Sequence, residues 1–196
     1  KAGNPVILTN GKVPPLILDC LQTKISIASK LIAVGGEEVV SEAVFAEFAD
    51  RTGKLERTTL DTAGIFGPNQ GSKTIGGSLV IAADKTIVQN TVIEGDLILA
   101  DSIGQGTVQL RNVTVLGTTT INGGGPHSVI LFNFKGEKVV GNAPASGKIR
   151  LVAQGNTGID WLRMNASGIL EEKALTGSGF QIVEILQGAE ILLIGS

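Results

Sequence analysis

A glycine recurs along this chain at the start of short segments whose third and fifth residues are restricted in type. Five positions carry it: Gly77, Gly95, Gly117, Gly147 and Gly188. The first four open the pattern glycine, any residue, Leu/Ile/Thr, any residue, Ile/Leu, whereas Gly188 keeps only the last position. A period of two is typical of a β-strand. The pattern therefore predicts one strand-and-turn unit that is repeated along the chain.

The spacing of these glycines measures the length of the unit. Successive intervals are 18, 22, 30 and 41 residues, and the last divides into about two units of 20 if Gly168 is a degenerate copy. Repeats of this length that contain only strands and turns stack into a parallel β-solenoid. We therefore expect an all-β fold, a right-handed parallel β-solenoid, whose coils occupy residues 77–196 and whose corners hold the five glycines. The content of 27 glycines and only 4% aromatic residues fits tight corners around a β-branched and aliphatic core.

Further strands are expected between the glycine-led ones. Alternating or apolar segments predict them at 86–88, 107–115, 128–132, 159–164 and 180–186. Each coil then contains two or three strands. The 30-residue interval after Gly117 requires an additional loop, which we place at residues 135–146.

Residues 1–76 are expected to form an N-terminal region of short strands, one helix and a loop. Val40, Val44 and Phe48 recur at a helical spacing, which predicts a short helix over residues 37–51. A helix beside a solenoid commonly covers the open end of its core, so we interpret this region as a cap. The glycine-rich stretch 52–76 is expected to be the loop that leads into the first coil.

Composition excludes some classes of function. The net charge is −2 and the pI is about 5.5, so the chain has no basic field with which to hold nucleic acid. No run approaches the ~18 apolar residues of a membrane span, and the start at Lys1 leads us to expect a mature or trimmed product. The single cysteine, Cys20, cannot form an internal disulfide, and is either a small buried hydrophobe or an intermolecular bridge or reactive thiol.

Residues 92–133 carry a likeness to a known family. Its elements are Glu94-Gly95-Asp96-Leu97, the turn Gly104-Gln105-Gly106, the strand 110–115, and three glycines at 123–125 ahead of Ser128. This stretch resembles the β-helical repeat domain of secreted surface proteins of spore-forming Gram-positive bacteria, domains that often accompany S-layer homology modules. The resemblance implies an extracellular location on the cell surface. No matching element is enzymatic, and the chain contains no S-layer homology module.

Two sequence patterns have a chemical interpretation beside a structural one. The segment 67–74, GPNQGSKT, nearly spells a phosphate-binding loop, but Ser72 replaces its last glycine and a strand, not a helix, is expected to follow. We therefore interpret it as a loop. A group of acids with one arginine would provide a calcium or lyase site if they converged, and otherwise consists of ordinary turn residues: Asp84, Glu94, Asp96, Asp101 and Arg111.

Two residues occur only once in the chain. His127 follows a glycine-proline turn and has no second histidine with which to form a metal site, so we expect a turn histidine. Trp161 is either a platform for sugar stacking or a residue that packs against a neighbouring coil or subunit. We expect neither a metal nor a cofactor.

The function that the sequence favours is structural and non-catalytic. A stacked coil has unpaired strand edges at its ends, and such edges bind further strands unless they are covered. We expect a self-assembling surface or extracellular fibre protein whose partners are copies of itself and cell-wall polysaccharide. The residues expected at the assembling edges are Val6, Ile7, Leu8, Ile191, Leu192, Leu193 and Ile194. The alternative is a carbohydrate-binding module around Trp161, or a polysaccharide lyase-like β-helix, on the cell surface.

Overall fold

The fold is a parallel β-solenoid. A computed structural model describes residues 57–142 and 147–195. These residues form about six turns, and every strand pair in them is parallel. The predicted all-β solenoid is confirmed. The expected N-terminal strands, the helix over residues 37–51, Val6–Leu8 and Cys20 lie outside the described residues.

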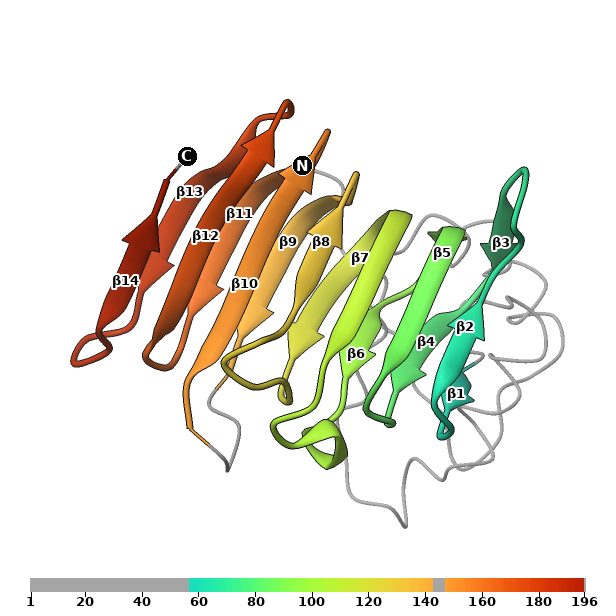
Figure 1. The fold of residues 1–196 in the computed structure, drawn as a ribbon, viewed down its shortest axis with the longest axis horizontal. Helices are drawn as coiled ribbons and strands as arrows, with labels where there is room; N and C mark the ends of the chain where they lie inside the picture. The colour runs from blue at the N-terminus through green and yellow to red at the C-terminus, as the bar shows by residue number, and fades with distance from the viewer. Residues whose placement is uncertain (1–56, 143–146, 196) are drawn as a thin grey trace, which may run out of the picture. The chain divides into compact units, whose positions relative to one another are not determined.

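The described strands are short, and several of them bend around a corner. In chain order they are β1 (Arg57–Leu60), β2 (Gly64–Phe66), β3 (Lys73–Ile75), β4 (Ser78–Ile81), β5 (Thr86–Ile93), β6 (Leu97–Leu99), β7 (Val108–Ile121), β8 (Ile130–Phe132), β9 (Lys135–Gly141), β10 (Ile149–Gly155), β11 (Gly158–Met164), β12 (Gly168–Leu175), β13 (Gly179–Ile185) and β14 (Ile191–Ile194). A 3-10 helix, η1 (Asp101–Ile103), lies between β6 and β7. Figure 1 shows the strands of successive coils lying side by side.

Each coil passes over three faces, which we call A, B and C. Face A contains β1, β4 and β6, followed by the C-terminal halves of β7, β9, β11 and β13. Face B contains β2, the first half of β5, the first part of β7, and then β8, β10, β12 and β14. Face C contains β3, the second half of β5, the middle of β7, and the first residues of β9, β11 and β13.

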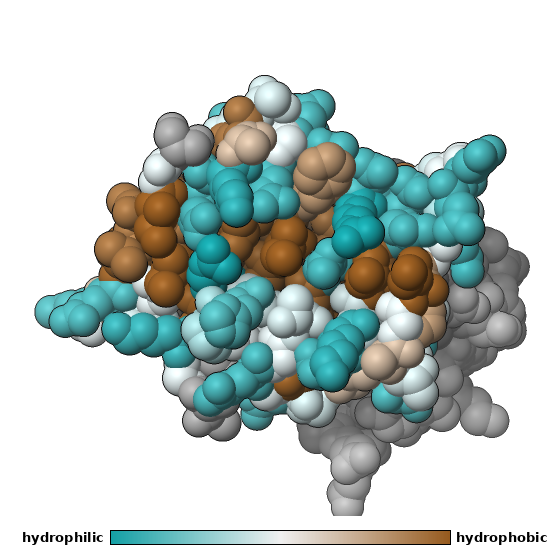
Figure 2. All heavy atoms as spheres, in the orientation of Figure 1, coloured by the Kyte–Doolittle hydropathy of each residue, from teal (hydrophilic) through white to brown (hydrophobic). Residues whose placement is uncertain are grey.

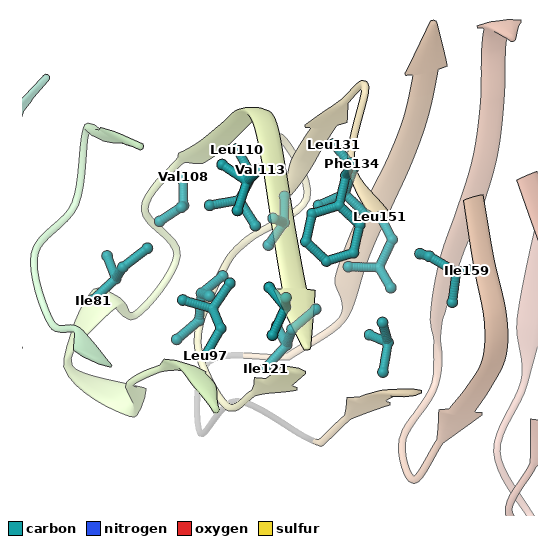
Figure 3. Packing of buried hydrophobic residues seen from close by; sticks show 14 of the residues in the cluster. Ile81, Leu97, Val108, Leu110, Val113, Ile121, Leu131, Phe134, Leu151 and Ile159 are labelled. Carbon is teal, nitrogen blue, oxygen red and sulfur yellow. The ribbon is translucent and has the colours of Figure 1, made fainter. Parts of the chain in front are cut away.

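The core fills the space between the three faces. Alternate residues are buried in strands such as β5 and β6, and these positions hold Leu, Ile and Val together with Thr86 and Thr91. The register places them in columns, so that Val88, Leu110 and Leu131 lie in successive coils of face B. Side chains from all faces meet inside, where Phe134 is fully buried (Figure 3). Because each coil covers the inner side chains of the one before it, the core is continuous along the stack.

An asparagine column fixes the corner between faces B and C. Asn90, Asn112 and Asn133 have φ of 49°, 53° and 52°, a left-handed conformation that asparagine tolerates better than most residues. The Asn112 amide donates to Asn90 Oδ1 and the Asn133 amide to Asn112 Oδ1, each at 2.8 Å. Gly155, with φ 58°, follows one coil later. These residues allow the chain to bend at the same place in each coil and join neighbouring coils by side-chain hydrogen bonds.

A glycine column occupies the corner between faces C and A. Gly77, Gly95 and Gly117 stack in three successive coils, with Gly95 N donating to Gly77 O at 3.0 Å and Gly117 N to Gly95 O at 3.2 Å. A Cβ at Gly95 would lie 2.6 Å from the carbonyl carbon of Gly77, and one at Gly117 would lie 2.5 Å from Gly95 O. Neither Gly95 nor Gly117 has a left-handed φ. Close approach of adjacent coils, and not backbone conformation, therefore requires glycine here.

The glycine column ends because the corner becomes shorter. Val115 pairs with Gly136 and Thr118 with Lys138, so Leu116 and Gly117 together face the single residue Glu137. Asp160 and Gln181 occupy this one-residue corner in the next two coils.

Gly147 and Gly188 are not part of the glycine column. They precede β10 and β14, which belong to face B, and they have φ of 125° and 87° with open space where a Cβ would be. The 30-residue interval from Gly117 to Gly147 therefore compares two different corners, whereas the 41-residue interval from Gly147 to Gly188 spans two coils at one corner.

Two expected loops are strands instead. The solenoid already includes strands before Gly77, because β1 pairs with β4 while β2 and β3 pair with β5. The loop expected at 135–146 contains β9, a strand of polar sequence that lies between β7 and β11. Both segments are rich in glycine and charge, and pairing with neighbouring coils outweighs their weak local preference for strand structure.

Candidate functional site

Two of the predicted acids bind the backbone of the next coil. Asp84 Oδ1 accepts hydrogen bonds from Lys85 N and Thr107 N, each at 2.6 Å. Asp96 Oδ1 accepts one from Thr118 N at 2.8 Å. These carboxylates therefore join successive coils at two different corners, Asp84 between faces A and B and Asp96 between faces C and A.

The other members of the group are also dispersed. Glu94 lies at the corner between faces C and A, Asp101 in η1, and Arg111 on face B, where its guanidinium donates to Gln109 Oε1. His127 is exposed in a turn. Within the described residues there is no group of three or more His, Cys, Asp or Glu side chains that could hold a metal ion. The structure does not bring the predicted lyase or calcium residues together.

The segment that resembles a phosphate-binding loop is a bulge of the first coil. It is followed by the strand β3 and not by a helix. Pro68 O accepts hydrogen bonds from Gln89 Nε2 at 3.1 Å and from Asn90 Nδ2 at 2.8 Å. The bulge is thus held against the second coil, and no helix N-terminus is present to bind a phosphate.

The last coil leaves an open edge, formed by β13 and β14. Among the described residues β14 pairs only with β12, and β13 only with β11. Large apolar side chains are exposed along this edge: Ile182 (60%), Ile185 (45%), Leu186 (45%), Leu192 (57%), Leu193 (69%) and Ile194 (40%). Figure 2 shows apolar surface at the end of the molecule that carries β14.

The register shows why this edge is apolar. Leu193 pairs with Leu170 and Ile185 with Met164, and both partners are buried inner residues. Leu193 and Ile185 therefore occupy inner positions that the next coil would cover. The predicted edge residues Ile191, Leu192, Leu193 and Ile194 form β14 itself, and Ile191 is partly buried against the core.

One part of the last coil is closed by a polar residue. Glu172 lies opposite the buried Ala153, in an inner column of face B, and its Oε1 accepts a hydrogen bond from Phe180 N at 3.1 Å. The carboxylate thus satisfies a backbone donor at the end of the stack. Apart from Phe180 N, no backbone donor of β13 or β14 is bonded to a carboxylate among the hydrogen bonds of the described residues.

A pair of hollows lies beside the one-residue corner between faces C and A. The first has a volume of about 280 Å³ and is lined by Thr114, Val115, Leu116, Lys135, Gly136, Glu137, Gly158, Asp160 and Ser178. The second, also of about 280 Å³, is lined by Glu137, Lys138 and Trp161. We call the two together the corner groove. Glu137 belongs to both hollows, so they adjoin.

Trp161 lies on the outer side of face A, in the column of Lys138 and Ile182. The Lys138 ammonium lies 5.1 Å from the centre of the indole ring, which is a cation–π contact. Both interpretations of Trp161 from the sequence therefore have a structural counterpart: the ring contacts a neighbouring coil, and it also lines a hollow. The sequence analysis did not identify Lys135, Glu137, Lys138 or Asp160, because their convergence depends on the register between coils.

No protein-family model matches the chain, and no curated protein or solved structure matches it. Among residues 57–142 and 147–195 no helix has the length and apolar character that a membrane span requires. The functional argument therefore rests on the open edge and on the corner groove.

Proposed function

We propose that this chain is a structural, non-catalytic protein that assembles with copies of itself through the open edge of β13 and β14. The observation that carries the proposal is the exposure of Leu193, an inner residue by register, to 69%. Unpaired strand edges and exposed inner side chains together form a surface that a further strand layer would cover.

A second copy suits this edge because it offers strands with the same spacing. Successive coils of one chain are held by parallel pairing and by columns of inner aliphatic residues. An arriving coil with the same geometry would satisfy the β13 and β14 edges and bury Ile185 and Leu193. A contact of this kind between two different ends does not close on itself, and therefore generates a filament.

The resemblance of residues 92–133 to surface-protein repeats supports an extracellular location, and we extend the proposal to a cell-surface or extracellular fibre. Strand donation by Val6, Ile7 and Leu8 falls outside the described residues and stays a prediction. Deletion of residues 1–12 tests it: assembly is lost, with the solenoid still folded, if this segment supplies the added strand.

The edge is tested by a matched pair of leucines. Leu193 and Leu116 are exposed to 69% and 62%, but Leu116 lies at the corner between faces C and A in the middle of the stack. We expect Leu193→Lys to abolish concentration-dependent association in analytical ultracentrifugation and filaments in electron micrographs. We expect Leu116→Lys to leave both unchanged.

Three results would contradict the proposal. The first is a wild-type protein that remains monomeric at its highest soluble concentration. The second is equal association of the Leu193→Lys variant and the wild type, and the third is equal loss of association in both leucine variants. Circular dichroism confirms that each variant retains its β structure before the comparison is made.

A further inference from the structure

The corner groove combines an aromatic ring with a balanced set of charges. Its charged side chains are Lys135, Glu137, Lys138 and Asp160, two of each sign. All four are exposed, so they are available to a ligand in solution. The indole of Trp161 adds an apolar surface beside them. A site with this balance favours a ligand that is uncharged and carries many hydroxyl groups.

Polar atoms converge on the floor of the first hollow. Gly158 has no side chain, and a methyl group in that place would stand 2.7 Å from Ser178 Oγ and 3.3 Å from Lys135 Nζ. Lys135 Nζ is itself oriented by Asn156 Oδ1 at 3.1 Å, and Asp160 Oδ1 accepts from Gln181 Nε2 at 2.6 Å. Hydrogen-bond donors and acceptors therefore lie close around Gly158, where a side chain would clash with Ser178 Oγ.

We propose that the corner groove binds a neutral oligosaccharide. A sugar ring presents C–H groups on its faces and hydroxyl groups around its edge. The C–H groups suit the electron-rich face of Trp161, while the hydroxyls donate to Glu137 and Asp160 and accept from Lys135 and Ser178. Two adjoining hollows of about 280 Å³ suit a chain of more than one sugar, because they share Glu137 as a common wall.

Lys138 occupies the place of the ligand on the indole ring. Its ammonium lies over the ring at 5.1 Å, and the side chain is exposed and flexible at its end. A sugar that stacks on this face of the ring displaces the Lys138 ammonium, so binding costs part of the cation–π energy between Lys138 and Trp161. Removal of the Lys138 ammonium is therefore expected to raise the affinity about two- to fivefold.

The chain contains its own reporter for this site. Trp161 is the single tryptophan and the chain has no tyrosine, so its fluorescence reports on the corner groove alone. Cellotetraose and chitotetraose serve as neutral probes, trigalacturonate as an acidic probe and a chitosan oligomer as a basic probe. We expect a saturable change in emission with at least one neutral probe, and weaker binding of both charged probes.

Three variants test the contacts by calorimetry with the neutral probe. Trp161→Ala is expected to lower the affinity about tenfold, as loss of an aromatic contact does, and Lys138→Ala to raise it. Glu184→Gln is the matched control, because this carboxylate lies on face A in β13 outside both hollows, and it should leave the affinity unchanged.

Four results would overturn the inference. The first is that a folded protein shows neither an emission change nor heat of binding with any neutral probe. The second is that a charged probe binds more tightly than the neutral ones. The third is wild-type affinity in Trp161→Ala, and the fourth is unchanged or lower affinity in Lys138→Ala. Ser178 directly precedes β13, so the first hollow reaches the last coil, and binding must be measured separately from assembly. The titrations are therefore made at a dilution where the protein is monomeric.

Discussion

The stacked glycines at the corner between faces C and A allow a quantitative test of the solenoid. In Gly95→Ala the new Cβ would lie 2.6–2.7 Å from Gly77 C, Gly77 O and Ser78 N. Non-bonded carbon atoms prefer about 3.5–4.0 Å, so the shortage is roughly 1 Å. All three atoms belong to the backbone of the neighbouring coil and cannot rotate away. The two coils must therefore separate locally, which strains the Gly95 N to Gly77 O hydrogen bond.

The expected destabilisation is at the upper end of the values for overpacking, about 3 kcal/mol. For a chain of this size 1 kcal/mol lowers the melting temperature by about 2–4 °C, so the shift is ~6–12 °C. Thermal unfolding followed by circular dichroism measures it. The control is Gly76→Ala, the residue just before the column, because its Cβ would have Glu94 Oε2 at 3.8 Å as its nearest neighbour.

Gly76→Ala should be neutral or slightly stabilising, since alanine restricts the unfolded chain. Equal melting temperatures for the two variants would refute the argument that coil separation is what requires glycine at position 95. The argument differs from one based on a left-handed backbone, because the φ of Gly95 is outside that region. A valine at the same site should therefore destabilise through contact with the neighbouring coil.

Two further predictions concern polar groups in the coils. Asn112→Gly removes two ladder hydrogen bonds but keeps the left-handed backbone, and we expect a loss of about 1 kcal/mol. Asn112→Ala also strains the backbone and should lose about 1 kcal/mol more of stability than Asn112→Gly. Equal melting temperatures for these two variants would contradict the role of φ. Thr119 Oγ1 is buried and has no hydrogen-bond partner among the described residues. Thr119→Val keeps the shape and should raise the melting temperature, by about 1 kcal/mol of stability, whereas a lower melting temperature would show that the hydroxyl is satisfied.

The fold could be predicted from the sequence because its inner positions are regular. The alternation in segments such as 78–81 and 97–99 persists in the buried residues of β4 and β6. The asparagine column had a signal that was overlooked: asparagine recurs at 90, 112 and 133, intervals of 22 and 21 residues that match one coil. A second series at 122, 142 and 165 forms another ladder through amide contacts of 2.7 and 2.8 Å.

The corner groove could not be predicted in the same way. It forms where Glu137 alone faces Leu116 and Gly117, and this change in corner length is a property of the pairing between coils. No spacing in the sequence distinguishes it from an ordinary insertion. Trp161 could be identified as a candidate because it is unique, but Glu137 and Lys138, which line the hollow beside it, belong to the preceding coil, 24 and 23 residues earlier.

Inner and outer positions of the coil thus differ in how well the fold explains which residues occupy them. Inner residues must match the coil above and below, so their identity follows from the fold, and Leu193 is an inner position that no described strand covers. Outer residues have no such constraint. Outer side chains of both charges gather around Trp161, and some of them also contact a neighbouring coil, as Lys135 does through Asn156 and Lys138 through the indole ring. Their proposed role in binding is what the oligosaccharide titrations test. The open edge and the corner groove are therefore two features of one architecture that meet at the start of β13, the first derived from the repeat and the second from the point where the repeat changes.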